Sequence, residues 1–345
     1  MVRTHRKYNI RLERHERELV RHFQKASEFL VKCQIFDPYV KEGILQGSVC
    51  PWEIGKADTY GFTILEDFHD TLEAMWVWCC YTRISGRKTY EANIKMGWNY
   101  IIANIDRHIP ANIEDGGLYN CSQMVLCGIL YKEIFLDNSY DRWIEFCGDR
   151  LTRYLMKSEL SEKNTGDFWI RCCWAWWMAS CLGYAGKFLN KNKWIEAARD
   201  FVRRTVTEER QPFSDLEKES SKKGPGGHDC FSCNANKVLA LLSCYSSKEA
   251  AEEIILKRFL PVAPRRFIKR NVDENPWNAN VAMALGKSYS LTGKDEFLTG
   301  YFSIIDELKR RDHGNSSALP RSKEFPVRES WVTFFYAYAY ASVIS

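Results

Sequence analysis

Acidic residues and one histidine open an apolar segment in the sequence LEDFHDTLEAMWVWCCYTRISGRKTY, residues 65 to 90. Asp67, His69 and Asp70 lie within four residues of one another, at the start of a run that is apolar nearly all round. Neighbouring carboxyl groups in partly desolvated surroundings acquire different pKa values, so that one can act as an acid and the other as a base. The segment therefore predicts acid and base chemistry at the end of a buried helix.

Further acids stand before or at the start of other apolar segments. They are Glu114, Asp115, Asp167, Asp229, Asp273, Glu274 and Glu329. An aspartate at a helix start commonly caps backbone N–H groups, and this reading is sufficient for any single member. Capping does not explain why so many converge on one end of the predicted fold. We expect Asp70, Asp167, Asp229 and His69 to be the catalytic residues.

Aromatic and polar residues near the same helix starts predict a binding site for a small molecule. Flat surfaces for stacking against a sugar would come from Trp52, Trp169 and Trp277. Hydrogen-bonding groups would come from Arg171, His228, Asn280 and Glu329. Such a polar set suits a saccharide better than a terpene, because a carbocation must be kept away from nucleophiles.

A repeat positions these residues. Short turns closed by an aromatic end at Tyr90, Tyr140, Trp194 and Phe297. Their spacings are 50, 54 and 103 residues, the last being about two periods, with CYSSKEA near Ala250 in the gap. With a helix at each end of the chain, the repeat predicts twelve helices in six pairs.

The two helices of each pair differ in pattern. The helix before each turn is apolar all round, which is typical of an interior, and the helix after it is amphipathic, as at Trp194, Ala197, Ala198, Phe201 and Val202. We predict an all-α (α/α)6 toroid as a single domain over residues 1–345, with six parallel inner helices. Their predicted ranges are about 67–84, 118–135, 167 onward, 229–244, 276 onward and 330–343. Loops before inner helices are long, so all of them gather with the helix N-termini at one end, where we expect a concave site.

This pattern of inner helices opened by Asp, turns such as ISGRKTY and aromatic-rich segments resembles the (α/α)6 toroid proteins. They comprise the six-hairpin glycosidases and the terpenoid cyclase and prenyltransferase group. The glycosidase resemblance implies two carboxylates facing each other across a sugar, roughly 5 to 10 Å apart. It also implies a short, often anionic, saccharide as substrate. A lyase or epimerase that uses His69 or His228 as base would present the same sequence.

Two alternatives remain open at this point. The segment DFHDTLEAM is similar to the DxDD-T-A segment of class II terpenoid cyclases at Asp67, Asp70 and Thr71, although His69 replaces the proton-donating Asp and the Q-and-W motifs of that family are missing. A helical ring can also be a binding scaffold whose charged outer helices meet a partner. The scaffold predicts acids paired with arginines, whereas an enzyme predicts unpaired carboxylates in an open pocket.

We expect no metal and no cofactor. The group His228, Asp229, Cys230 and Cys233 offers zinc ligands, but the Asp-x-Cys pair and the His of protein prenyltransferases have no clean counterpart here. The 13 cysteines include adjacent pairs in apolar helices, which indicates buried thiols rather than disulfides.

The charge pattern gives no sign of a nucleic-acid partner. The net charge of +5 is carried by short basic clusters that are typical of a solvated surface, and no nucleic-acid-binding motif is present. No run approaches the ~20 apolar residues that a membrane span needs. The basic N-terminal residues lack the apolar region of a signal peptide, which favours a cytoplasmic location.

Overall fold

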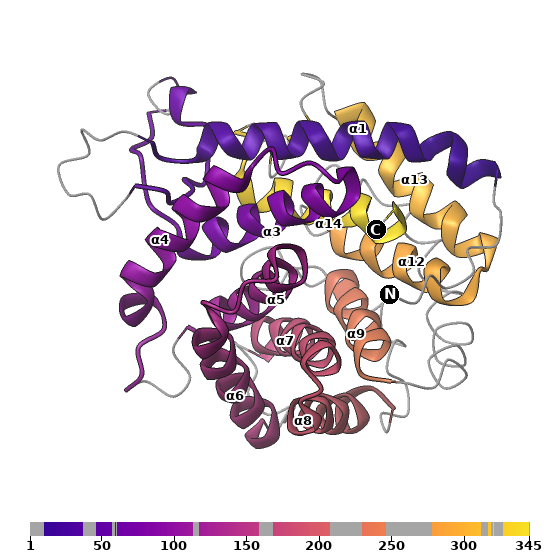
Figure 1. Cartoon of the computed structure of the whole chain (residues 1–345). Helices are drawn as coiled ribbons and strands as arrows, with labels where there is room; N and C mark the ends of the chain where they lie inside the picture. The colour runs from indigo at the N-terminus through magenta and orange to yellow at the C-terminus, as the bar shows by residue number, and fades with distance from the viewer. Residues whose placement is uncertain are drawn as a thin grey trace.

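The computed structural model describes residues 10–36, 46–56, 59, 61–112, 117–158, 168–207, 230–245, 278–311, 317–318, 320 and 327–344. Helices are the regular elements of these residues, and strand pairing within them is limited to isolated β-bridges (Figure 1). The all-α prediction is confirmed. Within the described ranges no helix is both long enough and apolar enough to cross a membrane.

Six inner helices form a closed ring. They are α3 (Phe68–Ser85), α5 (Leu118–Phe135), α7 (Phe168–Leu189), α9 (Cys230–Cys244), α12 (Asn278–Thr292) and α14 (Ser330–Ile344). Each contacts the next in chain order, and α14 returns to contact α3. Residues are buried on every side of α3 and α14, as expected for helices that have no polar face.

Outer helices cover this ring. They are α1 (Ile10–Cys33), α4 (Glu91–His108), α6 (Asp141–Lys157), α8 (Asn192–Val202, continued by a π-helical turn at Arg203–Thr207) and α13 (Asp295–Arg311). Each of α4, α6, α8 and α13 packs on the inner helix before it, and α1 packs on α14. The predicted buried face of α8 is confirmed at all five positions. The segment expected to hold the outer partner of α9 lies outside the described residues.

The short turns share one backbone conformation. The residue that follows α3, α5, α7 or α12 is in the left-handed region: Gly86 at φ 71°, Leu136 at 54°, Asn190 at 55° and Gly293 at 66°. Such a residue ends a helix by turning a backbone N–H back to a free carbonyl, as Gly86 N does to Thr82 O at 2.8 Å. The turns therefore end the inner helices sharply and leave the opposite end to the long loops.

Residues 46–56 tie two inner-helix starts together. Val49 N donates to Thr71 Oγ1 on α3 at 2.8 Å, and Ser330 N at the start of α14 donates to Pro51 O at 2.8 Å. A β-bridge also pairs Trp52 with Glu329. Part of the first long loop thus lies at the N-terminal end of the ring, which is where the loop lengths predicted it.

Side chains of different chemical kinds follow one another along the length of α3. On α3, one stripe at helical spacing holds Asp70 and Glu73 near the start, Trp76 in the middle, and Cys80 and Arg83 near the end. Ring contacts join Trp76 to Tyr338 (centroids 4.3 Å apart), Trp76 to Phe334 (5.7 Å) and Trp177 to Phe335 (5.7 Å). We call Trp76, Trp177, Phe334, Phe335 and Tyr338 the aromatic layer. It separates an acidic end of the α3 stripe from a basic end.

Candidate active site

Asp67 caps helix α3. Its backbone is extended at φ −137°, and its Oδ1 accepts from the backbone N–H of His69 (3.0 Å) and of Asp70 (3.2 Å). One aspartate therefore satisfies the free N–H groups of the first turn. The carboxyl group of Asp70 is left for other interactions, so the capping explanation applies to Asp67 and not to Asp70.

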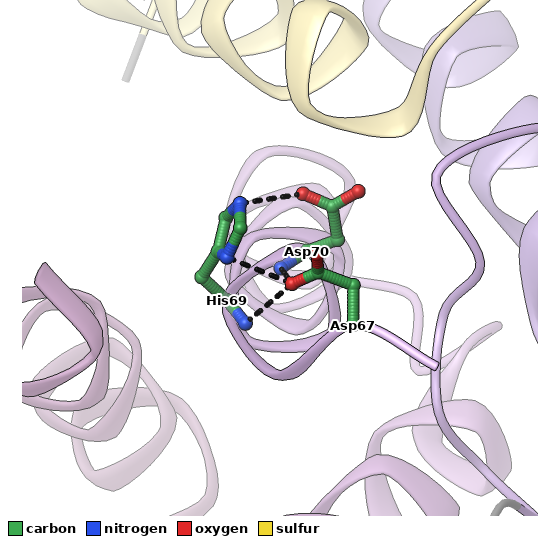
Figure 2. Close-up of side chains that lie close together, drawn as sticks. All are labelled: Asp67, His69 and Asp70. Atoms are coloured by element: carbon green, nitrogen blue, oxygen red, sulfur yellow. Dashed lines mark hydrogen bonds and ion pairs between the residues drawn. The ribbon is translucent and has the colours of Figure 1, made fainter. Parts of the chain in front are cut away.

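The His69 ring faces both aspartates, with one nitrogen directed at each (Figure 2). Its Nδ1 is 2.7 Å from Asp67 Oδ1, and its Nε2 is 3.2 Å from Asp70 Oδ1. Burial opposes the charging of the ring, but the Asp70 carboxylate and the hydrogen bond to Asp67 outweigh burial and raise the pKa of His69 to about 10. The side chain is therefore an imidazolium at neutral pH, with both nitrogens acting as donors.

Asp70 is a buried acid whose pKa is raised to near neutral pH. Its side chain is 1% exposed, and Ser330 Oγ donates to its Oδ2 at 2.5 Å from the start of α14. Burial and the charge of Asp67 raise its pKa to about 7, while His69 and Ser330 act in the opposite direction. At pH 7 the group is present both as acid and as base, which is the condition under which proton transfer is most effective.

Glu73 adds a second buried acid one turn further along α3. Its Oε1 accepts from Tyr119 Oη (2.6 Å) and Gln123 Nε2 (2.8 Å), both on α5. Its Oε2 is buried and has no hydrogen-bond partner in the described part of the chain. Burial raises the pKa of Glu73 well above its usual range. The sequence interpretation did not include Glu73; the signal was a glutamate three residues after Asp70 in an otherwise apolar helix.

Two other predicted site residues, Glu329 and Trp52, lie just before the start of α14 or are bridged to that segment. Glu329 is 2% exposed and directly precedes Ser330, and its charge acts on Asp70. Trp52, which is bridged to Glu329, is half-buried and stacks at 4.6 Å on Phe62.

Asn280 belongs to a separate polar contact on the ring. It is buried on α12 and donates to Asn236 Oδ1 on α9 at 3.0 Å. The remaining predicted residues cannot be placed: Asp167, Asp229, His228 and Trp277 lie outside the described residues, and so do the side chains of Trp169 and Arg171, whose backbone belongs to α7.

The partners of the acids discriminate between an enzyme and a scaffold. Glu66, just before the cap, pairs with Arg107. In contrast, the partners of Asp70 and Glu73 in the described part of the chain are histidine, serine, tyrosine and glutamine rather than arginine. The arginine pairing that the scaffold predicts therefore occurs at Glu66 but not, among the described residues, at Asp70 or Glu73.

The same trio is also the candidate for a metal ion. Within the described ranges, Asp67, His69 and Asp70 form the group whose potential ligand atoms all lie within 4.8 Å of one another. A metal would bind the neutral imidazole, so it would have to displace the proton that bridges His69 to a carboxylate. A proton and a metal ion would therefore compete for the same ring nitrogen, and metal binding at this trio would weaken as pH falls.

Comparison with known proteins places the fold. No protein-family model matches the sequence, and no curated protein matches it. Among solved structures, an unsaturated glucuronyl hydrolase specific for heparin aligns with a TM-score of 0.60 at 14% identity, covering 96% of each chain. A sugar epimerase from a ruminal bacterium aligns with a TM-score of 0.65 at 10% identity, covering 95% of this chain and 98% of that one.

An α-1,6-mannanase from Salegentibacter sp. aligns with a TM-score of 0.62 at 7% identity, covering 94% of this chain and 98% of that one. Together with the closed ring of inner helices, these similarities show that the chain has the (α/α)6 toroid fold of the six-hairpin glycosidase-like proteins.

Proposed function

We propose that the protein is a carbohydrate-active enzyme that hydrolyses a short saccharide, with Asp70 as its general acid. The observation that carries this proposal is the buried Asp70 carboxyl group at the start of an inner helix, with a pKa of about 7 and no arginine beside it among the described residues. A carboxylic acid that keeps its proton near neutral pH can protonate a glycosidic oxygen.

Glycoside hydrolysis also needs a second carboxylate that acts as base or nucleophile. Glu329 is the candidate next to Ser330, and Asp167 and Asp229 are the candidates that immediately precede α7 and α9 in sequence. Glu73 is less suited to this role, because Tyr119 and Gln123 already occupy its Oε1 and burial disfavours its charged form. We assign Glu73 the role of a buried hydrogen-bonding group that fixes Tyr119.

Hydrolysis is favoured over epimerisation or elimination through His69. An imidazolium with a pKa of about 10 has no free lone pair at neutral pH, so it cannot abstract a proton from a sugar carbon. Base chemistry at His228 remains a second possibility. The hydrogen-bonding groups around Asp70 and Glu73, which are Ser330, Tyr119 and Gln123, suit a polyol better than a prenyl chain.

The substrate class follows from the same reasoning. The similar structures include an unsaturated glucuronyl hydrolase specific for heparin, a sugar epimerase and an α-1,6-mannanase. We propose a short saccharide for this chain, an acidic one if Arg171 contacts it. The enzyme would need no cofactor.

The test is turnover of defined substrates by the purified protein. Neutral di- and trisaccharides, oligosaccharides that end in a uronic acid or an unsaturated uronic acid, and prenyl diphosphates are incubated separately, and products are separated by chromatography. We expect cleavage of one saccharide class, with kcat reduced at least about 100-fold in Asp70→Asn. Asp306→Asn, on the exposed face of α13, is the matched control.

The remaining outcomes decide against the proposal. Turnover of a prenyl diphosphate that is lost in Asp70→Asn would make the segment from Asp67 to Met75 a cyclase acid site. Interconversion of sugar epimers without cleavage would replace hydrolysis by epimerisation. No turnover of any substrate would favour the scaffold.

A further inference from the structure

Two basic side chains from different inner helices meet on the other side of the aromatic layer. Arg83 lies near the end of α3, and Lys287 lies in the second half of α12. Both are partly buried, and the charge of Arg83 is close enough to lower the pKa of Lys287. Thirteen residues of α3 separate Arg83 from Asp70, which is about 20 Å of helix, so this pair is distinct from the acidic site.

The carboxylates of the described residues do not balance this charge. Arg83 Nη1 is 3.7 Å from Glu133 Oε2, too long for a hydrogen bond, and Glu133 is itself 34% exposed. Arg83 Nη2 donates to the Cys80 sulfur at 3.7 Å, and the guanidinium also hydrogen-bonds the Tyr184 hydroxyl oxygen. Arg83 Nε is buried without a hydrogen-bond partner in the described part of the chain. The guanidinium remains charged at every physiological pH.

Lys287 is the less compensated member of the pair. Its Nζ lies 5.4 Å from the ring centroid of Tyr338, and no ion pair to it occurs among the described residues. Burial and the charge of Arg83 lower the pKa of Lys287 to about 8, while the thiols of Cys80 and Cys181 act in the opposite direction. The amine is still mostly protonated at pH 7. Two partly desolvated cations and one half-exposed carboxylate leave an uncompensated positive charge.

The groups around the pair are suited to an oxyanion. Tyr184 on α7 lies beside Arg83 and carries a hydroxyl group, and burial raises its pKa, so that hydroxyl remains a neutral donor. Arginine presents donors in a planar fork that matches phosphate or carboxylate oxygens, and lysine adds a point charge. A bound anion would also supply the acceptor that buried Arg83 Nε lacks.

We propose that Arg83 and Lys287, with the Tyr184 hydroxyl, form a binding site for a phosphate- or sulfate-type oxyanion at the short-turn end of the ring. The anion offsets the repulsion between the two cations and links α3 to α12 across α14. This site does not depend on the proposed saccharide chemistry. Its ligand is either the free oxyanion or the phosphate group of a phosphomonoester.

The test measures binding of inorganic phosphate to the full-length protein by calorimetry at constant ionic strength, with chloride as the reference salt. We expect saturable 1:1 binding, and loss of at least about tenfold in affinity in Lys287→Met, because a hydrogen bond to a charged group is removed. Lys88→Met is the matched control, since Lys88 is an exposed lysine in the turn after α3. A hexose phosphate in a parallel titration distinguishes the free anion from an ester.

A second readout needs no variant. Lysines labelled by 13C reductive methylation are titrated by NMR, and the resonance with a midpoint near pH 8 should move to higher pH when phosphate is added. Phosphate binding that is unchanged in Lys287→Met, or an absence of saturable binding, would refute the site. A titration midpoint that stays the same when phosphate is added would also refute it. Saccharide turnover in Lys287→Met should equal that of the wild type, so failure of this proposal and failure of the proposed function are separable.

Discussion

Replacing Asp70 by asparagine should make the protein more stable at alkaline pH while abolishing its activity. Asparagine has nearly the shape of a protonated aspartic acid and retains an acceptor for Ser330 Oγ. The folded-state pKa of Asp70 is about 7 and its ordinary value is 3.8, so the folded protein holds this proton more tightly than the unfolded chain. One pKa unit corresponds to about 1.4 kcal/mol, so the ionised carboxylate costs the folded state roughly 4 kcal/mol at pH 8.

The sign of the effect follows from linkage. A raised folded-state pKa gives stability that is fully present below the unfolded pKa and is lost as pH rises through the folded value. The wild type should therefore lose stability between about pH 4 and pH 7 through this group, and Asp70→Asn should not. The two proteins should have nearly equal free energies of unfolding near pH 4 and differ by up to roughly 4 kcal/mol at pH 8.

The assay is urea unfolding followed by circular dichroism at pH 4.5, 6 and 8 for both proteins. Equal m-values in the two proteins would show that the comparison concerns stability alone. If Asp70→Asn is less stable than the wild type at pH 8, Asp70 serves as a structural ion-pair partner of His69, and its assignment as a general acid fails. Gain of stability on removal of a functional group is the expected trade-off at an active site.

Three further substitutions test other parts of the structure by urea unfolding at pH 7. Tyr119→Phe removes a donor to buried Glu73 and should cost about 1 to 2 kcal/mol; no loss would contradict that hydrogen bond. Leu136→Gly should stabilise by about 0.5 to 1 kcal/mol, because Leu136 is 84% exposed in a left-handed conformation, and destabilisation would mean that its side chain packs. Gly148→Ala should cost about 1 to 3 kcal/mol, because a Cβ there overlaps the Trp194 indole; a neutral effect would show that the helices can move apart.

Helix positions in this fold could be predicted from sequence because each helix type carries its own local pattern. The apolar run from Leu118 to Phe135 and the amphipathic face of α8 each contain their own structural signal. The turns added a second local signal, since a glycine or asparagine follows three of the four inner helices described above. Leu136, the fourth, adopts a left-handed conformation that local preference disfavours, so the residue type did not signal this turn.

The candidate site was predicted only where its residues are neighbours in the chain. Asp67, His69 and Asp70 share one helical turn, so their proximity followed from the sequence. Glu73 was missed because its importance comes from two partners on α5, and contacts between helices cannot be read from a one-dimensional pattern.

The pairing of Arg83 with Lys287 was missed for a related reason. These residues are far apart in sequence, and only closure of the ring brings them together. The same closure also brings Ser330, from the last helix, to the carboxyl group of Asp70, a contact that the spacing within α3 does not indicate.

The packing of α1 against α14 has a consequence for biosynthesis. Leu19, Phe23 and Leu30 on α1 are completely or almost completely buried, and α14 is a principal neighbour of that helix. About 300 residues separate the two helices, so at ribosomal rates of about 5 to 20 residues per second the first helix waits roughly 15 to 60 s for its partner. During that interval nascent chains present an uncovered apolar stripe. Dependence on holdase chaperones, and aggregation when translation stalls late, are the expected cellular signatures of a ring that closes last.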